Sequence, residues 1–208
     1  MTETDPEYGS LWEYRRRVGD MSQHVRAVGT SEASWNQWRS ERDDLFRSHP
    51  DSPIPKEQRS GFAGLPFSNY AQAWNVDATL EEFSPSPAGL VNSGDGSTHS
   101  LRIGEVVGNS PNGPFSLAAF WMNDYGGGIF IPFRDETNGT GTYGGGRYLL
   151  DSAKGADLGT HDGRVVLDFN FAYHPSCVHD SRWSCPLAPQ ESLLNFAVPV
   201  GERLRHSG

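Results

Sequence analysis

The sequence predicts a mainly β domain, built as an antiparallel β-barrel or sandwich with an N-terminal helix packed across it. Short apolar stretches with a period of two recur through the second and third quarters of the chain, as strands with one buried face do. The 24 glycines and 14 prolines among 208 residues supply the frequent turns that such a fold needs. Strands and helices do not alternate, so a parallel α/β sheet is not expected.

The N-terminal part is predicted to be a tail followed by one helix. Residues 1–30 are polar and are expected to form the tail, with at most a short helix around Leu11–Val18. A single β-rich domain over residues 31–208 should open with a helix from about Ser34 to Ser48, in which Ser34 begins a capping box. Apolar side chains recur on one face of that helix, at Trp35, Trp38, Leu45 and Phe46. Its solvent face should carry Arg39, Glu41, Arg42 and Asp43.

Seven strands are expected after this helix. Turn-forming residues separate several of them, notably at Pro85–Pro87, Asn92–Thr98 and Asn123–Gly128. The expected strands are Ala73–Phe83, His99–Val107, Phe115–Trp121, Ile129–Phe133, Arg147–Asp151, Arg164–Phe171 and Ser192–Val200.

The charge and hydropathy of the chain argue against several kinds of partner. A formal net charge of −9 at pH 7 disfavours nucleic acid and anionic membranes. The acidic N-terminus lacks the apolar core of a signal peptide, and no stretch approaches the roughly eighteen apolar residues of a membrane span. We therefore expect a cytoplasmic protein whose partner is a small molecule, and a homodimer is left open.

A glycine-rich turn, TYGGGRYL, is the first candidate binding element. Three glycines between Tyr143 and Arg147, with Gly145 at their centre, allow backbone N–H groups to approach a ligand. Arg134 and Arg147 lie near the two ends of this unit and could hold a carboxylate or phosphate. The alternatives are a glycine-built hairpin or bulge, and ion pairs from the arginines to Asp135 or Asp168.

The segment DFNFAYH supplies the second candidate. In a strand, Asp168 and Asn170 would face one way as the wall of a polar pocket, while Tyr173 and the phenylalanines would face the other. Alternatively, Asp168 caps a turn through backbone N–H groups.

Two cysteines and the histidines near them allow three interpretations. In a reducing cytoplasm Cys177 and Cys185 are expected to be free thiols, buried for packing in the simplest case. Together with His174 and His179 they alternatively have the ligand types of a zinc site, although no CxxC pair is present. In the third interpretation a cysteine is a nucleophile with a histidine as its base. No cofactor is predicted beyond the zinc alternative.

Six longer motifs are spread from Trp38 to Arg203: WRSERDDLFRSHPDSPI, GFAGLPF, FIPFRDETNGTGTYGGGRYLLD, VVLDFNFAYHPSC, CPLAPQE and PVGER. Together they resemble the DUF1684 family of bacterial and archaeal proteins, a domain of unknown function. Members of that family usually read like AYNPPC where this chain has Ala172–Cys177, so His174 stands in place of an asparagine. The resemblance implies a β-rich soluble fold and no established reaction.

The leading functional hypothesis is an enzyme that acts on a small polar, anionic molecule, as in a biosynthetic tailoring step. The chemistry would be acid/base catalysis of hydrolase, lyase or isomerase type. His174, Asp168 and Cys177 are the expected catalytic residues, and the expected ligand-binding residues are Arg134, Tyr143, Gly145, Arg147, Asn170 and Tyr173. The alternatives are a small-ligand-binding β-barrel without catalysis and a structural or interaction domain.

Overall fold

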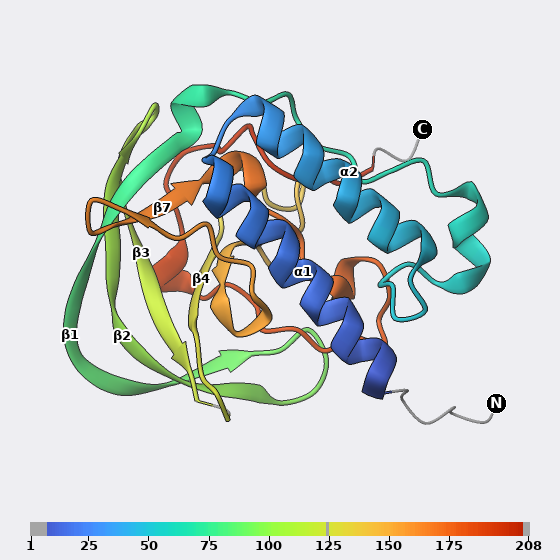
Figure 1. Cartoon of the computed structure of the whole chain (residues 1–208). Helices are drawn as coiled ribbons and strands as arrows, with labels where there is room; N and C mark the ends of the chain where they lie inside the picture. The colour runs from blue at the N-terminus through green and yellow to red at the C-terminus, as the bar shows by residue number, and fades with distance from the viewer. Residues whose placement is uncertain (1–7, 124, 206–208) are drawn as a thin grey trace.

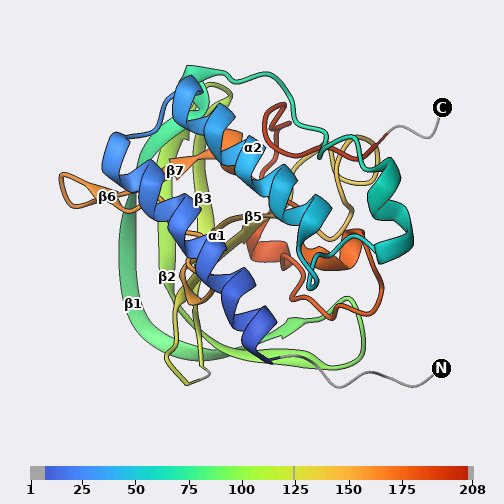
Figure 2. The same cartoon turned by 45° about the vertical axis from the view of Figure 1, so that its right-hand side comes forward.

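The computed structural model describes residues 8–123 and 125–205, and it shows two helices followed by one antiparallel sheet. Helix α1 (Tyr8–Val28) and helix α2 (Glu32–Ser48) form a helical hairpin that lies across one side of a curved sheet (Figures 1 and 2). The architecture is therefore mixed rather than mainly β.

Both helices begin earlier than the sequence predicted. Helix α1 occupies most of the expected tail and buries Met21 and Val25 against the rest of the molecule. At the start of α2, the Ser31 hydroxyl accepts a hydrogen bond from the Ser34 amide at 3.2 Å, and the Ser34 hydroxyl accepts one from the Ser31 amide at 2.9 Å. The capping box therefore starts at Ser31, because a serine can take the place that Glu or Gln usually has at its third helical position.

The sheet has seven antiparallel strands in the order β5-β4-β3-β2-β1-β7-β6. No pairing between β5 and β6 closes this order within the described residues, so the antiparallel sheet is not closed into a barrel, which was one of the two predicted forms. The strands are β1 (Asn75–Val91), β2 (Ser97–Ser110), β3 (Gly113–Met122), β4 (Ile129–Phe133), β5 (Arg147–Asp151), β6 (Thr160–His161) and β7 (Arg164–Asp168).

Strands β1 and β2 are longer than predicted, because the prolines of β1 lie at a β-bulge and do not end the strand. Pro85 and Pro87, predicted to form a turn, lie inside β1, where the register with β2 shifts between Glu82 and Ser86. A proline is tolerated at a bulge because a residue there need not donate to the ladder. A Cβ on Gly104 of β2 would lie 2.4 Å from the backbone carbonyl oxygen of Glu81, so only glycine lets the two strands approach there.

Two other expected strands differ in the structure. The stretch Ser192–Val200 is irregular chain after a short 3₁₀ turn, η6 (Gln190–Ser192). Strand β7 ends at Asp168, and the 3₁₀ turn η4 (Phe169–Phe171) follows because the Asp168 carboxylate accepts a hydrogen bond from the backbone N–H of Asn170 at 2.9 Å. Local capping by a short acidic side chain thus overrides the strand pattern.

Aromatic packing joins the helices to the segment that follows β7. On the inner face of the sheet, Phe169 contacts Trp74, Phe115 and Phe133 edge to face. The next aromatic, Phe171, belongs to a second cluster, in which its ring centroid lies 5.1 Å from that of Trp38 on α2. The helical hairpin therefore packs directly over residues 169–175, where the sequence predicted a site.

Among the described helices, none combines the length and apolar character required to cross a membrane.

Candidate functional site

The sequence-predicted site residues divide into closed polar networks, a thiol cluster and the wall of a cavity. Arg147 belongs to the first group. It is fully buried, and its guanidinium donates to the Asp135 carboxylate at 2.6 Å and to the backbone carbonyls of Val198 and Val200. Burial lowers the pKa of Arg147, against the raising effect of Asp135. This guanidinium ties the C-terminal segment to β5.

Arg134 does not join Arg147 in this network. Its backbone pairs with the irregular C-terminal chain, donating to Ser192 and accepting from Leu194 at 2.8 Å each. The side chain is half-buried, and its stem lies beside Gly146, where a Cβ would come within 3.2 Å of the Arg134 Cγ. Arg134 forms no ion pair within residues 8–123 and 125–205.

Asp168 and Asn170 form a second closed network, at the start of η4. The Asn170 side chain donates to Asp168 at 2.7 Å and pairs with both backbone groups of Ala71. The Asn170 carbonyl accepts from the Trp35 indole at 2.9 Å, which fixes α2 over the turn. Burial raises the pKa of Asp168 to about 6, even though the hydrogen bonds from Asn170 oppose that rise. Neither side chain lines the cavity between the two helices and the segment from Tyr173 to Cys185, or the larger hollow on the sheet.

Glu202 is the centre of a third network, which sequence reasoning missed. Its carboxylate has no exposed surface, and it accepts from the Arg42 guanidinium at 3.3 Å and from the His174 amide at 3.0 Å. The His174 and His179 rings approach it at 3.7 and 3.6 Å. Burial opposes the charge of Glu202, but Arg42 and the two histidines outweigh it and hold the pKa of this carboxyl well below its usual range.

Arg42 was expected on the solvent face of α2, and the structure corrects this. It is only 6% exposed and lies over the rings of Trp38, Phe46 and Tyr173, at 5.6, 4.5 and 4.9 Å from their centroids. The signal was present in the sequence, since Arg42 stands four residues after Trp38 and four before Phe46, on the same stripe. Glu202 lies in the PVGER motif, between Gly201 and Arg203.

The ring of His174 is held by this network. Its Nε2 accepts a hydrogen bond from the Tyr143 backbone N–H at 3.1 Å, so in the neutral ring the proton is on Nδ1, which faces Glu202. The ring therefore connects the glycine-rich turn to Glu202. Its Nε2 lone pair is already used and is not free to accept a proton from a ligand.

The cysteines form a cluster with Tyr143. Cys177 is half-buried in the 3₁₀ turn η5 (Ser176–Val178), and Cys185 is buried. Hydrogen bonds from the Cys185 thiol, then from Ser93 and Tyr143, lower the pKa of Cys177 to about 6, although burial opposes this. The same contact raises the pKa of Cys185 far above its usual value.

Within the described part of the chain, no three His, Cys, Asp or Glu side chains are grouped as a metal ion requires.

A cavity of about 250 Å³ lies between α1, α2 and the segment from Tyr173 to Cys185. Its walls are largely apolar and include several aromatic rings, with Tyr14 from α1 and Trp38 and Phe46 from α2 facing Tyr148 and Tyr173. Basic side chains outnumber acidic ones around it: Arg15, Arg42 and Lys154 line it together with Asp51. Of the predicted site residues, Tyr173, His174 and Cys185 line this cavity, whereas Cys177 does not.

Three buried polar atoms of residues that line this cavity lack hydrogen-bond partners among the described residues. Two are donors, the Nε of Arg42 and the indole nitrogen of Trp183, and one is an acceptor, the Oδ2 of Asp51. Such groups are costly to bury without a partner, so they mark a place where a ligand or water is expected to bind.

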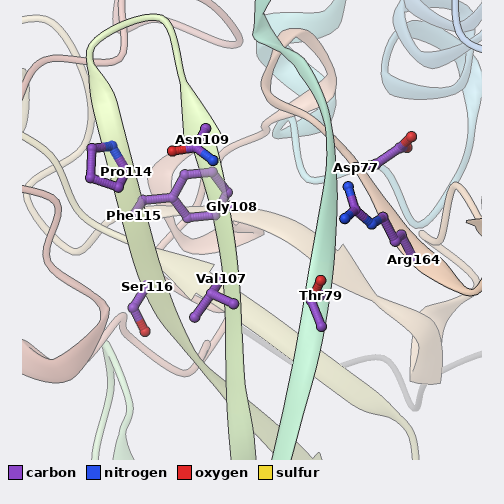
Figure 3. Close-up of a pocket in the computed structure, with 9 residues that line it drawn as sticks. All are labelled: Asp77, Thr79, Val107, Gly108, Asn109, Pro114, Phe115, Ser116 and Arg164. Carbon is purple, nitrogen blue, oxygen red and sulfur yellow. The ribbon is translucent and has the colours of Figure 1, made fainter.

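A larger hollow, of about 740 Å³, lies on the open side of the sheet (Figure 3). In the close-up, Arg164 of β7 lies beside Asp77 and Thr79 of β1 on one side of the hollow, and Asn109 and Ser116 lie on the other side. The exposed Arg164 and the open shape of this hollow leave no enclosed volume for a ligand. The smaller cavity under α1 is therefore the better candidate.

Comparison with known proteins agrees with the resemblance seen in the motifs. Residues 60–203 match a family described as "Protein of unknown function (DUF1684)". A solution structure of an uncharacterized protein from Haloarcula marismortui is 33% identical, with a TM-score of 0.60 over 85% of this chain and 96% of that one. Among curated proteins, none matches this chain.

Proposed function

This chain belongs to the DUF1684 family, and we propose that it binds a small organic anion with an aromatic or apolar body in the cavity under α1. The family description supplies no activity, so the proposal is supported by the geometry of the cavity alone.

The observation that carries the proposal is the state of Arg42. Its guanidinium is buried among three aromatic rings, one of its nitrogens pairs with Glu202, and its Nε has no partner among the described residues. A guanidinium binds a carboxylate or phosphate more strongly in such a poorly solvated place than at the surface. The aromatic walls would hold the body of the ligand, and Arg15 and Lys154 add positive charge.

Binding is better supported than acid/base catalysis in this cavity. Asp168 and Cys177, two of the three expected catalytic residues, do not line it, and the Nε2 of His174 already accepts a hydrogen bond from Tyr143. A general base must reach the proton that it removes. None of the three predicted catalytic residues therefore provides a free base at the wall of the cavity.

The helical hairpin contributes much of this cavity, although the family match begins at residue 60. Leu11, Tyr14, Val18 and Met21 of α1 line it, as do Trp38, Arg42 and Phe46 of α2. The proposed ligand is therefore selected in part by residues outside the matched region.

Benzoate, benzamide and benzylammonium test this proposal, because they share a ring and differ in charge. We expect benzoate to bind in isothermal titration calorimetry and to raise the melting temperature, with a weaker effect of benzamide and none of benzylammonium. Equal binding of the anion and the cation, or the lack of saturable benzoate binding at millimolar concentrations, would contradict the proposal.

Two variants of α1 test whether the anion binds in this cavity. Val18→Trp should fill the cavity from the half-buried face of α1 and abolish benzoate binding. Asp20→Trp adds the same side chain at an exposed position of the same helix and should leave binding unchanged. Cooperative unfolding of both variants, measured by circular dichroism, verifies that each is folded. Benzoate binding that survives Val18→Trp in a folded protein would assign the anion to another site.

A further inference from the structure

The cavity under α1 contains a hydrogen-bond acceptor as well as the guanidinium of Arg42. The Oδ2 atom of Asp51 is buried at its wall and has no hydrogen-bond partner among the described residues. Within the same residues, Arg42 is paired with Glu202 and not with Asp51. A ligand whose anionic group binds Arg42 therefore leaves Asp51 without a partner, unless the ligand also carries a hydrogen-bond donor.

The loop that carries Asp51 is held in place by other parts of the chain. The guanidinium of Arg59 donates to three backbone carbonyls of this loop at 2.7 to 2.9 Å, those of His49, Pro50 and Ile54. The Asp51 amide donates to the Nδ1 of His49 at 3.0 Å, and the Nε2 of His49 lies 2.5 Å from the carboxylate of Glu13 on α1. The backbone of Asp51 is therefore ordered at the cavity wall before a ligand binds, which lowers the entropic cost of binding.

A second loop, which carries Trp183, is bonded to the first. The guanidinium of Arg182 donates to the backbone carbonyl of Ser52 at 2.8 Å. Arg182 directly precedes Trp183, and Ser52 directly follows Asp51. The indole N–H of Trp183 also lines the cavity and is buried without a partner among the described residues. Two loops in direct contact thus contribute one unused donor and one unused acceptor to the cavity wall.

A hydroxyl group is the smallest group that matches both of these atoms. It can donate its proton to the Oδ2 of Asp51 and accept a hydrogen bond from the indole of Trp183. An ammonium group only donates, so it would leave the indole N–H without a partner. A second carboxylate only accepts, and Asp51 would repel it.

We propose that the ligand of this cavity is a hydroxylated aromatic acid. Its carboxylate binds Arg42, its ring lies among the aromatic side chains of the walls, and its hydroxyl binds Asp51 and Trp183. This inference rests on the proposed function and adds to it the second polar group of the ligand. Asp51 then determines specificity, because a substituent that cannot donate would leave its buried carboxylate oxygen without a partner.

Isothermal titration calorimetry with substituted benzoates tests the inference. We expect 3-hydroxybenzoate or 4-hydroxybenzoate to bind about tenfold more tightly than benzoate, as a hydrogen bond to a charged group allows. The methyl ether of the tighter isomer should lose this gain, because it cannot donate to Asp51. If neither hydroxybenzoate binds more tightly than benzoate, or if the ether keeps the gain, the inference fails, whereas the cavity proposal requires benzoate binding alone.

The charge of the second group is tested with 4-(aminomethyl)benzoate, which carries an ammonium group in place of the hydroxyl. It should bind more weakly than the tighter hydroxybenzoate, and tighter binding would overturn the assignment of a hydroxyl. If benzoate and both hydroxybenzoates fail to bind, the cavity proposal fails and this inference fails with it.

Variants of the two loops test where the hydroxyl binds. In Asp51→Ala, the ratio of the dissociation constants of benzoate and the tighter hydroxybenzoate should fall to about one. Trp183→Phe keeps an aromatic ring but removes the N–H, and it should lower this ratio in part. Asp44→Ala removes an exposed carboxylate of α2 that does not line the cavity, and it should keep the wild-type ratio. Circular dichroism verifies that each variant is folded, and a folded Asp51→Ala protein with the wild-type ratio would overturn the inference.

Discussion

At the scale of single residues, burial decides what each ionisable group does. Arg147 and Glu202 are both completely enclosed, and each is paired with an opposite charge. Asp168 is almost as buried, but its hydrogen-bond partner is Asn170, which carries no positive charge. Burial therefore raises the pKa of this carboxyl group toward neutral pH.

Replacing Asp168 with asparagine should remove a pH-dependent loss of stability. The pKa of Asp168 is about 6 in the folded protein, against 3.8 for an ordinary aspartate. Because the folded protein binds this proton more tightly than the unfolded chain, the protonated carboxyl group stabilises the fold. This contribution is complete below the pKa of the unfolded state and is lost as the pH rises through about 6. In urea unfolding from pH 4 to pH 7.5, the free energy of unfolding of Asp168→Asn should rise relative to that of the wild type, by up to about 3 kcal/mol. Asp95→Asn, on an exposed turn, controls for the change of charge, and a difference independent of pH would contradict the prediction.

Arg147→Met should destabilise the protein by about 3–5 kcal/mol, because it leaves the Asp135 carboxylate buried without its cation. Two carbonyls of the C-terminal segment would also lose their donor. Adding Asp135→Asn should recover part of the loss. The matched control is Arg134→Met, on the half-buried arginine of the same strand–turn–strand unit, which should cost much less in the same denaturant titration. Equal losses for the two arginines would show that the buried pair contributes little.

At the scale of elements, the sequence predicts the helices and strands whose boundaries are set by their own residues. The apolar stripe of α2 predicts its existence and its end, and alternation places β2, β3, β4 and β5 within a few residues. The prediction fails where contacts with distant residues determine the local structure. The segment Ser192–Val200 alternates like a strand, yet its backbone is held by Arg134 and by the Arg147 guanidinium. Helix α1 has a polar sequence and is stabilised by packing on α2.

The start of α2 depends on its capping box, so Ser31→Ala should destabilise the protein by about 1 kcal/mol. The Ser34 amide would lose its acceptor, while the rest of the helix is unchanged. Ser40→Ala, at an exposed position within α2, removes the same hydroxyl from a helix interior and should be neutral or slightly stabilising. Thermal and urea unfolding of the two variants measure the difference, and equal effects would mean that the box contributes nothing.

At the scale of the whole molecule, the candidate site is an assembly of distant segments, and this limits what the sequence could predict. The motifs placed Tyr143 and His174 in one predicted site, and in the structure the Tyr143 amide donates a hydrogen bond to the His174 ring. They could not show that Asp168 and Asn170 pair with Ala71, or that a helix from the expected tail covers a cavity beside Tyr173. Such contacts join residues about a hundred or more positions apart, and no local periodicity records them.

Glu202 connects the parts of the molecule that surround this site, and Glu202→Gln should therefore destabilise the whole fold. Gln can still accept from the His174 amide, but Arg42 would lose its counter-charge in a buried place, at a cost of about 3–5 kcal/mol near neutral pH. The folded pKa of Glu202 lies well below 4.5, so its stabilising effect is complete above that value and is lost as the pH falls toward the folded pKa. The difference between variant and wild type should thus be constant from pH 5 to pH 8 and shrink below about pH 4.5. Urea titrations across this range measure it, with the exposed Glu191→Gln as the control. If the difference did not shrink in acid, the loss would come from packing, and the charge of Glu202 would not be what holds α2 to the C-terminal segment.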